Sequence, residues 1–141
     1  MPHYFEFDSI HKILRCRLEG DITDGSVKDC YLAAAQFAAA TNPSVGLVDF
    51  SDVASVNVSA ETVRDLAHRP PAIPGPGPRF LVAPSDCLYG LARMFQECGS
   101  EQCPALHVVR TLEEAYNFIG VRKPQFEPLG PRARVVRQGM G

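Results

Sequence analysis

Apolar and charged residues alternate near the start of the chain. Residues 12–19 follow a period of two, and the aromatic stretch 4–7 precedes them. Such a period, with one apolar and one charged face, is typical of antiparallel strands. Asp8 and Ser9, which favour turns, lie between the two stretches. The pattern predicts a β-hairpin over about the first twenty residues, ending at Gly20.

After the hairpin, helical periodicity alternates with short apolar runs. Val27, Tyr31 and Ala34 recur at helical spacing. Ser59 and Thr111 suit the caps of two further helices, because their hydroxyl groups accept the unpaired N–H groups there. The expected helices lie over about 24–41, 59–68, 85–98 and 111–119, and the expected later strands over 45–50, 80–83 and 107–109. This alternation predicts an α/β fold with parallel strands joined by right-handed crossovers, in a mixed five-stranded sheet with about four helices.

Two segments lack any periodicity. Residues 70–78 are almost entirely Pro or Gly, which is typical of a stiff linker. Residues 121–141 contain three prolines and three glycines, and they carry five basic side chains against Glu127 alone. We therefore expect a single domain over residues 1–120, followed by a basic, flexible tail over residues 121–141.

Length and composition indicate an ordinary globular domain. The chain has 141 residues, of which 45% are hydrophobic and 21% charged, close to average usage. No stretch approaches the ~18 apolar residues that a membrane span needs, and residues 1–16 lack the basic end and apolar run of a signal peptide. We expect a cytoplasmic protein without a transmembrane segment. Residues 1–120 carry nine basic against 15 acidic side chains, which disfavours a nucleic-acid partner.

The five cysteines do not follow the pattern of a metal site or a disulfide framework. They stand at positions 16, 30, 87, 98 and 103, and an odd number without a secretory context indicates reduced thiols. Cys98 and Cys103 have no second Cys or His pair nearby to complete a zinc site. We therefore expect no metal and no cofactor. Cys87, in the first turn of the third helix, is the candidate for a reactive thiol, because the helix dipole favours a thiolate there; an inert thiol is the alternative.

Four short segments resemble the STAS/SpoIIAA-like superfamily, which includes bacterial anti-sigma-factor antagonists and the cytosolic domains of sulfate transporters. The segments are LEGDIT at 18–23, VDFSDV at 48–53, YGLARMF at 89–95 and TLEEA at 111–115. More narrowly, the chain resembles the branch of bacterial SpoIIAA-like proteins. The resemblance extends from residue 4 to about residue 120, and it implies the SpoIIAA/STAS-like α/β fold.

The resemblance also implies a phosphorylation switch before the second helix. In the family, the loop there typically reads Asp-Ser-Ser-Gly, and its first serine accepts a phosphate from a partner kinase. Here Asn57 stands at the position of the family's Asp, and Val58 at that of the phosphoacceptor, so the switch cannot operate at that position. Ser59 follows one residue later. We expect it to cap the helix, with a displaced phosphorylation site as the alternative.

Loops at the carboxyl ends of parallel strands usually form the binding surface in open α/β sheets. We therefore expect a partner or ligand to bind at the loops after Asp49 and Ala83, and at the helices that these loops enter. The candidate residues are Ser59, Asn57, Ser85, Tyr89 and Arg93. Tyr89 and Arg93 are one helical turn apart, which suits a cation–π pair.

Three functions remain open at this point. The first is a non-enzymatic STAS/SpoIIAA-like module of bacterial regulation, which binds a protein partner or senses a ligand. The second is a carrier of a small apolar ligand or lipid, of the SEC14-like type, which would need a cavity lined by Phe5, Phe7, Phe37 and Phe95. The third is an enzyme that uses Cys87. The sequence also leaves open whether two copies form a homodimer.

Overall fold

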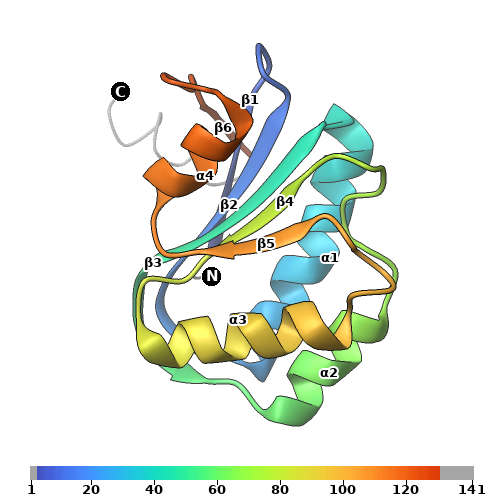
Figure 1. Cartoon of the computed structure of the whole chain (residues 1–141), viewed down its shortest axis with the longest axis vertical. Coiled ribbons are helices and arrows are strands. Elements are labelled where there is room, and N and C mark those ends of the chain that lie inside the picture. Colours follow the sequence, from blue (N-terminus) through green and yellow to red (C-terminus); the bar gives the residue numbers. More distant parts are fainter. Residues whose placement is uncertain (1–2, 131–141) are drawn as a thin grey trace.

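The computed structural model describes residues 3–130, which form one mixed β-sheet with helices on both faces (Figure 1). The strands are β1 (His3–Asp8), β2 (Ile13–Thr23), β3 (Val45–Asn57), β4 (Arg79–Val82), β5 (Leu106–Val109) and β6 (Glu127–Leu129). The helices are α1 (Asp24–Thr41), α2 (Ala60–His68), α3 (Asp86–Cys98) and α4 (Leu112–Ile119).

The strands lie in the order β5-β4-β3-β2-β1-β6. β2, β3, β4 and β5 are parallel to one another, whereas β1 is antiparallel to both β2 and β6. The helices α1, α2 and α3 lie on one side of the sheet, and α4 covers the other (Figure 1). The predicted α/β class, the mixed sheet and the four helices are confirmed.

The sheet has six strands and not the predicted five. The sixth strand, β6, pairs with β1 and lies in the stretch 121–141 that was expected to be a tail. Within that stretch Val121 is buried, and Phe126 packs against the core under α4. β6 is only three residues long and includes Pro128, so its pairing leaves no periodic pattern in the sequence. Residues 131–141 of the expected tail lie outside the described residues.

β3 is longer than predicted, and the loop expected after Asp49 is therefore part of a strand. β3 continues beside β2 to Asn57, through two register shifts. Asp49 is buried and accepts hydrogen bonds from the backbone N–H and the hydroxyl of Ser51, at 2.9 and 2.5 Å. The added stretch is mostly polar because it is largely exposed, which hides it from a search for apolar runs. Only Val58 and Ser59 separate β3 from α2.

Each helix begins at a short hydroxyl side chain. Thr23, Ser59, Ser85 and Thr111 each accept a hydrogen bond from a backbone N–H of the turn that follows. α4 ends at Gly120, whose φ of 74° lies in the left-handed region that favours glycine. Since every cap follows a parallel strand, the starts of all four helices lie at the carboxyl ends of β2, β3, β4 and β5.

Apolar side chains form a core on each face of the sheet. Alternation along β2 places Leu14 and Leu18 in the core shared with α1 and α3, and Ile13 in the core under α4. Cys16 and Cys30 lie in the first core with their sulfur atoms 3.0 Å apart, and burial raises the pKa of the Cys16 thiol. All five cysteines are free thiols. The pair acts as two small apolar side chains that join α1 to β2.

The Pro-rich segment, residues 70–78, is held by a buried arginine. Arg79 is 7% exposed, and burial lowers its pKa. Its guanidinium donates, at 2.7–3.3 Å, to the backbone carbonyl oxygens of Ser44, Ile73, Pro74, Gly75, Gly77 and Pro78. A Cβ atom at Gly77 would lie 1.8 Å from the Ser44 carbonyl oxygen, so glycine is required for this close approach. The segment is therefore packed against the starts of β3 and β4.

A buried carboxylate joins the hairpin to the segment after α4. Asp8 is fully buried and accepts hydrogen bonds from the backbone N–H groups of Ile10, His11 and Gln125 at 2.9–3.0 Å. The Nδ1 atom of His11 lies 2.9 Å from one carboxylate oxygen. Burial opposes the ionisation of Asp8, but these hydrogen bonds outweigh it and lower the pKa of the carboxyl group.

Replacing Asp8 by Asn should destabilise the fold in a pH-dependent way. The pKa of Asp8 in the folded state lies below the ordinary value of 3.8, so its contribution is complete above that value and is lost as the pH falls through the folded pKa. We expect Asp8→Asn to cost about 2–3 kcal/mol at pH 7, because hydrogen bonds to charged groups are worth ~1.5–3 kcal/mol. Urea unfolding at pH 7 and pH 3 measures the difference, which should shrink at pH 3. An equal loss at both pH values would contradict this role.

Replacing Arg79 by Met should loosen the Pro-rich segment. The variant keeps an apolar stem of similar length but removes the Arg79 donor from six carbonyl oxygens, of which that of Pro78 still accepts from the Gly46 N–H. We expect a loss of about 2–4 kcal/mol in urea unfolding, because a hydrogen bond to a charged group is worth ~1.5–3 kcal/mol and the acceptors at exposed Ser44, Pro74 and Gly75 can turn to water. Arg93→Met is the control, since Arg93 is exposed and pairs with exposed Glu97 at 3.6 Å, and it should change stability by less than ~1 kcal/mol. Similar losses in the two variants would refute the role of Arg79.

Candidate functional site

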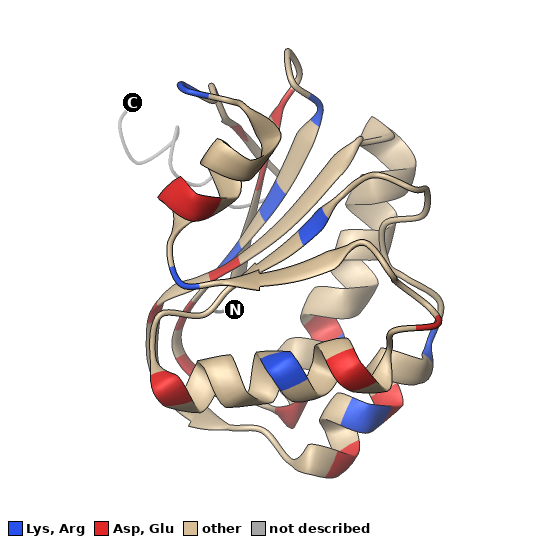
Figure 2. Cartoon of the chain, viewed as in Figure 1, with Lys and Arg blue, Asp and Glu red and all other residues tan. Residues whose placement is uncertain are grey.

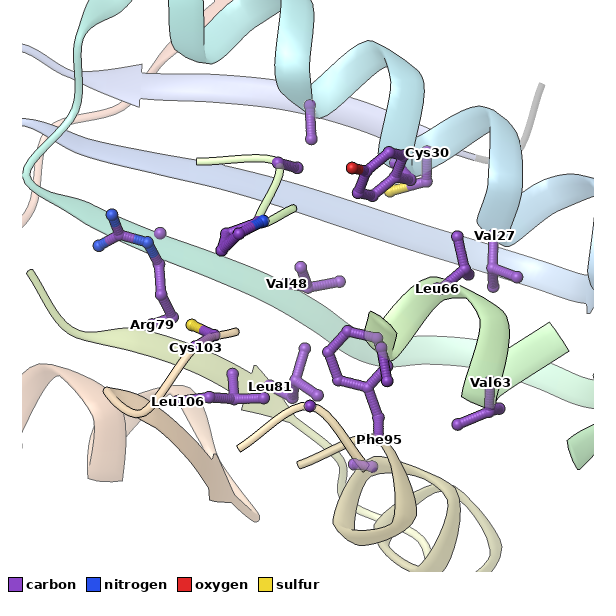
Figure 3. A pocket seen from close by; sticks show the side chains of 18 of the residues that line it. Val27, Cys30, Val48, Val63, Leu66, Arg79, Leu81, Phe95, Cys103 and Leu106 are labelled. Carbon is purple, nitrogen blue, oxygen red and sulfur yellow. The ribbon is translucent and has the colours of Figure 1, made fainter. Parts of the chain in front are cut away.

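An apolar cavity of about 240 Å³ lies between the sheet and the helices α1, α2 and α3 (Figure 3). Val48 of β3 and Leu81 of β4 line it from the sheet. Val63 and Leu66 line it from α2, and Phe95 lines it from α3. The cavity is therefore a space between the two layers of the fold.

Arg79 and Tyr31, two polar residues that line the cavity, already have hydrogen-bond partners. Arg79, at one end, donates to the Pro-rich segment and to Ser44. The hydroxyl of Tyr31 donates to the carbonyl oxygen of Pro70 at 2.5 Å. Burial raises the pKa of the Cys103 thiol and outweighs the opposite effect of Arg79. The cavity can therefore exclude water and hold apolar groups, but it offers a ligand few hydrogen bonds.

The aromatic lining differs from the prediction. Of Phe5, Phe7, Phe37 and Phe95, only Phe95 lines the cavity. Phe5 and Phe37 pack on each other with ring centroids 4.8 Å apart, and Phe7 packs against the same core. These three rings fill the space between the hairpin and α1, so the layers are closely packed there. Periodicity identifies inward-facing aromatic residues, but it does not show which of them meet.

The carboxyl edge of the sheet, which we define as residues 23–24, 57–59, 83–86 and 110–112, contains most of the predicted site. Ser59 joins α2 to α1: its backbone N–H donates to Asp24 Oδ1 at 2.7 Å, and its hydroxyl lies 3.1 Å from Asp24 Oδ2. The Ser59 N–H lowers the pKa of the Asp24 carboxyl group. Asn57 is exposed at the end of β3, whereas Val58 turns toward the cavity and lines it. The two residues between β3 and α2 thus touch both the edge and the cavity.

The start of α3 carries the other predicted residues. Ser85 is exposed and caps α3. The cation over the Tyr89 ring is Arg110, at 4.0 Å from the ring centroid, and not Arg93 as predicted. Arg93 is exposed and pairs with Glu97 one turn along the helix, at 3.6 Å. Arg110 reaches Tyr89 because the end of β5 lies beside the start of α3, a proximity that helical spacing does not reveal.

Two residues of this edge were missed by the sequence analysis. Asp24 fixes the start of α2 although it lies 35 positions before Ser59. Arg110 pairs with Asp86 at 3.1 Å and donates to the carbonyl oxygen of Pro84 at 3.2 Å. The only sequence feature that pointed to Asp24 was its place next to Thr23, the cap of α1. The partners of Asp24 and Arg110 depend on the order of the strands in the sheet, and local sequence patterns do not contain that order.

Cys87 lies exposed in the first turn of α3. A nucleophilic thiol needs a base, but His107 packs against the rings of Phe80 and Phe118, with centroids 5.4 and 4.4 Å away. Within residues 3–130 the hydrogen bonds and ion pairs give Cys87 no partner. The geometry around this thiol therefore provides no assembled base for a nucleophile.

Acidic side chains surround the carboxyl edge. The first turns of the four helices carry Asp24, Glu61, Asp86, Glu113 and Glu114. Figure 2 shows this acidic character at the starts of α3 and α4. Negative charge at helix N-termini is stabilised by the helix dipole. It also makes this edge a surface that attracts positive charge.

In the described part of the chain, no helix is both long and apolar enough to cross a membrane. The same residues contain no group of three or more His, Cys, Asp or Glu side chains placed to hold a metal ion.

Comparison with known proteins identifies the fold. No family model and no curated protein matches the sequence. Among solved structures, the unphosphorylated anti-sigma factor antagonist SpoIIAA is similar, with a TM-score of 0.55 and 14% identity over 85% of this chain and 99% of that one. The phosphorylated form of the Bacillus cell fate determinant SpoIIAA gives a TM-score of 0.45 and 17% identity over 82% and 98% of the two chains. The first of these likenesses, together with the order of the elements, shows that the chain has the STAS/SpoIIAA-like fold.

Proposed function

We propose that the chain is a non-enzymatic regulatory module that binds a protein partner through the carboxyl edge of its sheet. The observation that carries the proposal is the placement of four helix starts at this edge, with exposed side chains of Asn57, Ser59 and Ser85 beside them. Open α/β sheets commonly bind at this edge. The similar structure, SpoIIAA, is described as an anti-sigma factor antagonist, which supports a protein as the partner and bacterial regulation as the setting.

The charge of the carboxyl edge suggests what the partner presents. Acidic side chains occupy the first turn of each helix, whereas Arg110 is engaged by Asp86 and Tyr89. A surface of this sign would accelerate association with a basic patch and repel nucleic acid. We therefore propose a protein partner with a basic contact surface.

A second candidate function is the binding of an apolar ligand, and the cavity beneath α2 favours it. An enzyme that uses Cys87 finds less support, because His107 packs against aromatic rings and no base is assembled at the thiol. The interaction module remains the function that the site supports best.

Charge reversal in the first turns of α2 and α3, beside or within the carboxyl edge, should weaken partner binding. In affinity purification from the source cells, we expect a partner retained by the wild type to be lost by the double variant Glu61→Lys, Asp86→Lys. Binding of that purified partner should weaken at least about tenfold, or 1.4 kcal/mol, and the wild-type affinity should fall with salt. Glu101→Lys is the control, since it reverses an exposed charge in the turn after α3. Equal retention by all three proteins would contradict the proposed surface.

We further propose Ser59 as a site at which phosphorylation would alter this edge. Ser59 is exposed, and both its N–H and its hydroxyl lie against the Asp24 carboxylate. A phosphate brings a charge of ≈ −1.5 to −2, which would repel Asp24 and separate the start of α2 from α1. Ser59, which caps α2, is thus also a residue at which an added phosphate would change the structure of the carboxyl edge.

A matched pair of variants tests this coupling. Asp and Asn are both good N-caps, so Ser59→Asp and Ser59→Asn differ chiefly in the charge placed beside Asp24. We expect Ser59→Asp to have the lower urea midpoint at pH 7, and the difference to vanish in an Asp24→Asn background. It should also shrink as the pH falls through the pKa of Asp24, which lies below the ordinary value of 3.8. A difference that persists in the Asp24→Asn background would show that the charge acts elsewhere. Intact-mass analysis of protein from its own host then shows whether Ser59 carries phosphate.

A further inference from the structure

We propose that the cavity beneath α2 is a binding site for a small, uncharged, apolar molecule. The inference deepens the second candidate function and goes beyond the interaction module. Its test below does not involve the carboxyl edge or any partner protein, so its failure would leave the interaction proposal unaffected.

The cavity lies where a core would ordinarily be filled. Val48 and Leu81 stand on two central strands and face the helices, yet both are only partly buried. Val63, Leu66 and Ala67 of α2 are buried but belong to neither core cluster; all three line the cavity. α2 thus presents its apolar face to a space and not to the sheet.

The size of the space fits a small molecule. Protein interiors are packed so closely that few voids exceed a water molecule, whereas this cavity measures about 240 Å³. It lies just below the ~300–1,000 Å³ usual for small-molecule sites. A helix from a partner protein, with a diameter of ≈ 10–12 Å, would be too large for it.

The chemistry of the lining selects an uncharged ligand. Two cations line the cavity. Arg79 has all its N–H groups directed at backbone carbonyl oxygens, and Arg69, at the rim, pairs with Asp65 at 2.8 Å, so the charge of each is already engaged. The Tyr31 hydroxyl is taken by Pro70. A charged ligand would lose its hydration here and gain no partner in return. An apolar molecule would instead gain from burial against side chains such as Val48, Leu81 and Phe95.

The rim shows where the ligand enters. Among the lining residues, Pro70 and Gln102 are exposed, and they belong to the segment after α2 and the turn after α3. The guanidinium of Arg69 lies over the Tyr31 ring, 5.5 Å from its centroid. Together with the Tyr31 hydrogen bond, this contact links α1 to the end of α2. These few contacts would have to open and close as a ligand enters.

Fluorescence titration with N-phenyl-1-naphthylamine, an uncharged probe whose emission rises in apolar surroundings, tests the proposal. We expect saturable binding of one probe per chain and a rise in the thermal midpoint. The double variant Val48→Phe, Leu81→Phe fills the cavity and should bind the probe at least tenfold more weakly while melting no lower than wild type. Leu32→Phe is the control, because Leu32 is 56% exposed on α1 and should leave binding unchanged. Absent saturation in the wild type, or equal binding by the filled variant, would overturn the proposal.

Two further measurements on the wild-type chain keep the test independent of the filled variant's folding. Cys103 lines the cavity, whereas Cys87 lies outside it and is exposed. Bound probe should therefore slow the alkylation of Cys103 by N-ethylmaleimide at least threefold and leave that of Cys87 unchanged. The anionic analogue 1-anilinonaphthalene-8-sulfonate should bind at least tenfold more weakly than the uncharged probe. Equal slowing of both thiols would overturn the location of the site, and tighter binding of the anion would overturn the ligand class.

Discussion

The amino-terminal side of the sheet depends on how a single buried cation is stabilised. A buried charge ordinarily needs an opposite charge, but the guanidinium of Arg79 is surrounded by backbone carbonyl oxygens. The Pro-rich segment needs this arrangement as much as the arginine does. Proline has no N–H group, so the segment cannot fold back on itself through a regular ladder, and the Arg79 side chain donates to its carbonyl oxygens instead. One side chain therefore shapes a nine-residue connection and fixes one end of the cavity.

The two faces of the sheet differ in how completely side chains fill the space beneath the helices. Under α4, large side chains such as Phe80 and Ile13 are fully buried. On the opposite face α1 packs on the hairpin and α3 on the core, while α2 leaves the space beneath it unfilled. The cavity and the carboxyl edge meet at one turn, where Val58 lines the first and Ser59 belongs to the second. A structural change in the cavity or at the carboxyl edge would therefore displace the start of α2.

Local chemistry made much of this fold predictable. The hairpin, the four helices and caps such as Ser59 and Thr111 follow from side chains that act on their own neighbours in sequence. The elements that the sequence did not predict depend on distant partners. β6 forms by pairing with β1, and the end of β3 is extended because it pairs with β2. In the site, Ser59 was placed correctly as a cap, but its bond to Asp24 and the contact of Arg110 with Tyr89 arise from strand order. The cavity is less predictable still, since it depends on what the apolar side chains leave unfilled.

The hydrogen bond between Asp8 and the backbone of Gln125 spans 117 positions, and this has a consequence for how the chain is made. A ribosome releases the hairpin first, while the N–H group that completes the environment of Asp8 emerges only near the end of the domain. Until then the carboxylate has only the hydrogen bonds within the hairpin, from Ile10 and His11, and β1 lacks its neighbour β6. The first strand to be synthesised is thus among the last to be locked in place, so the nascent domain stays incomplete until almost all of it has left the exit tunnel.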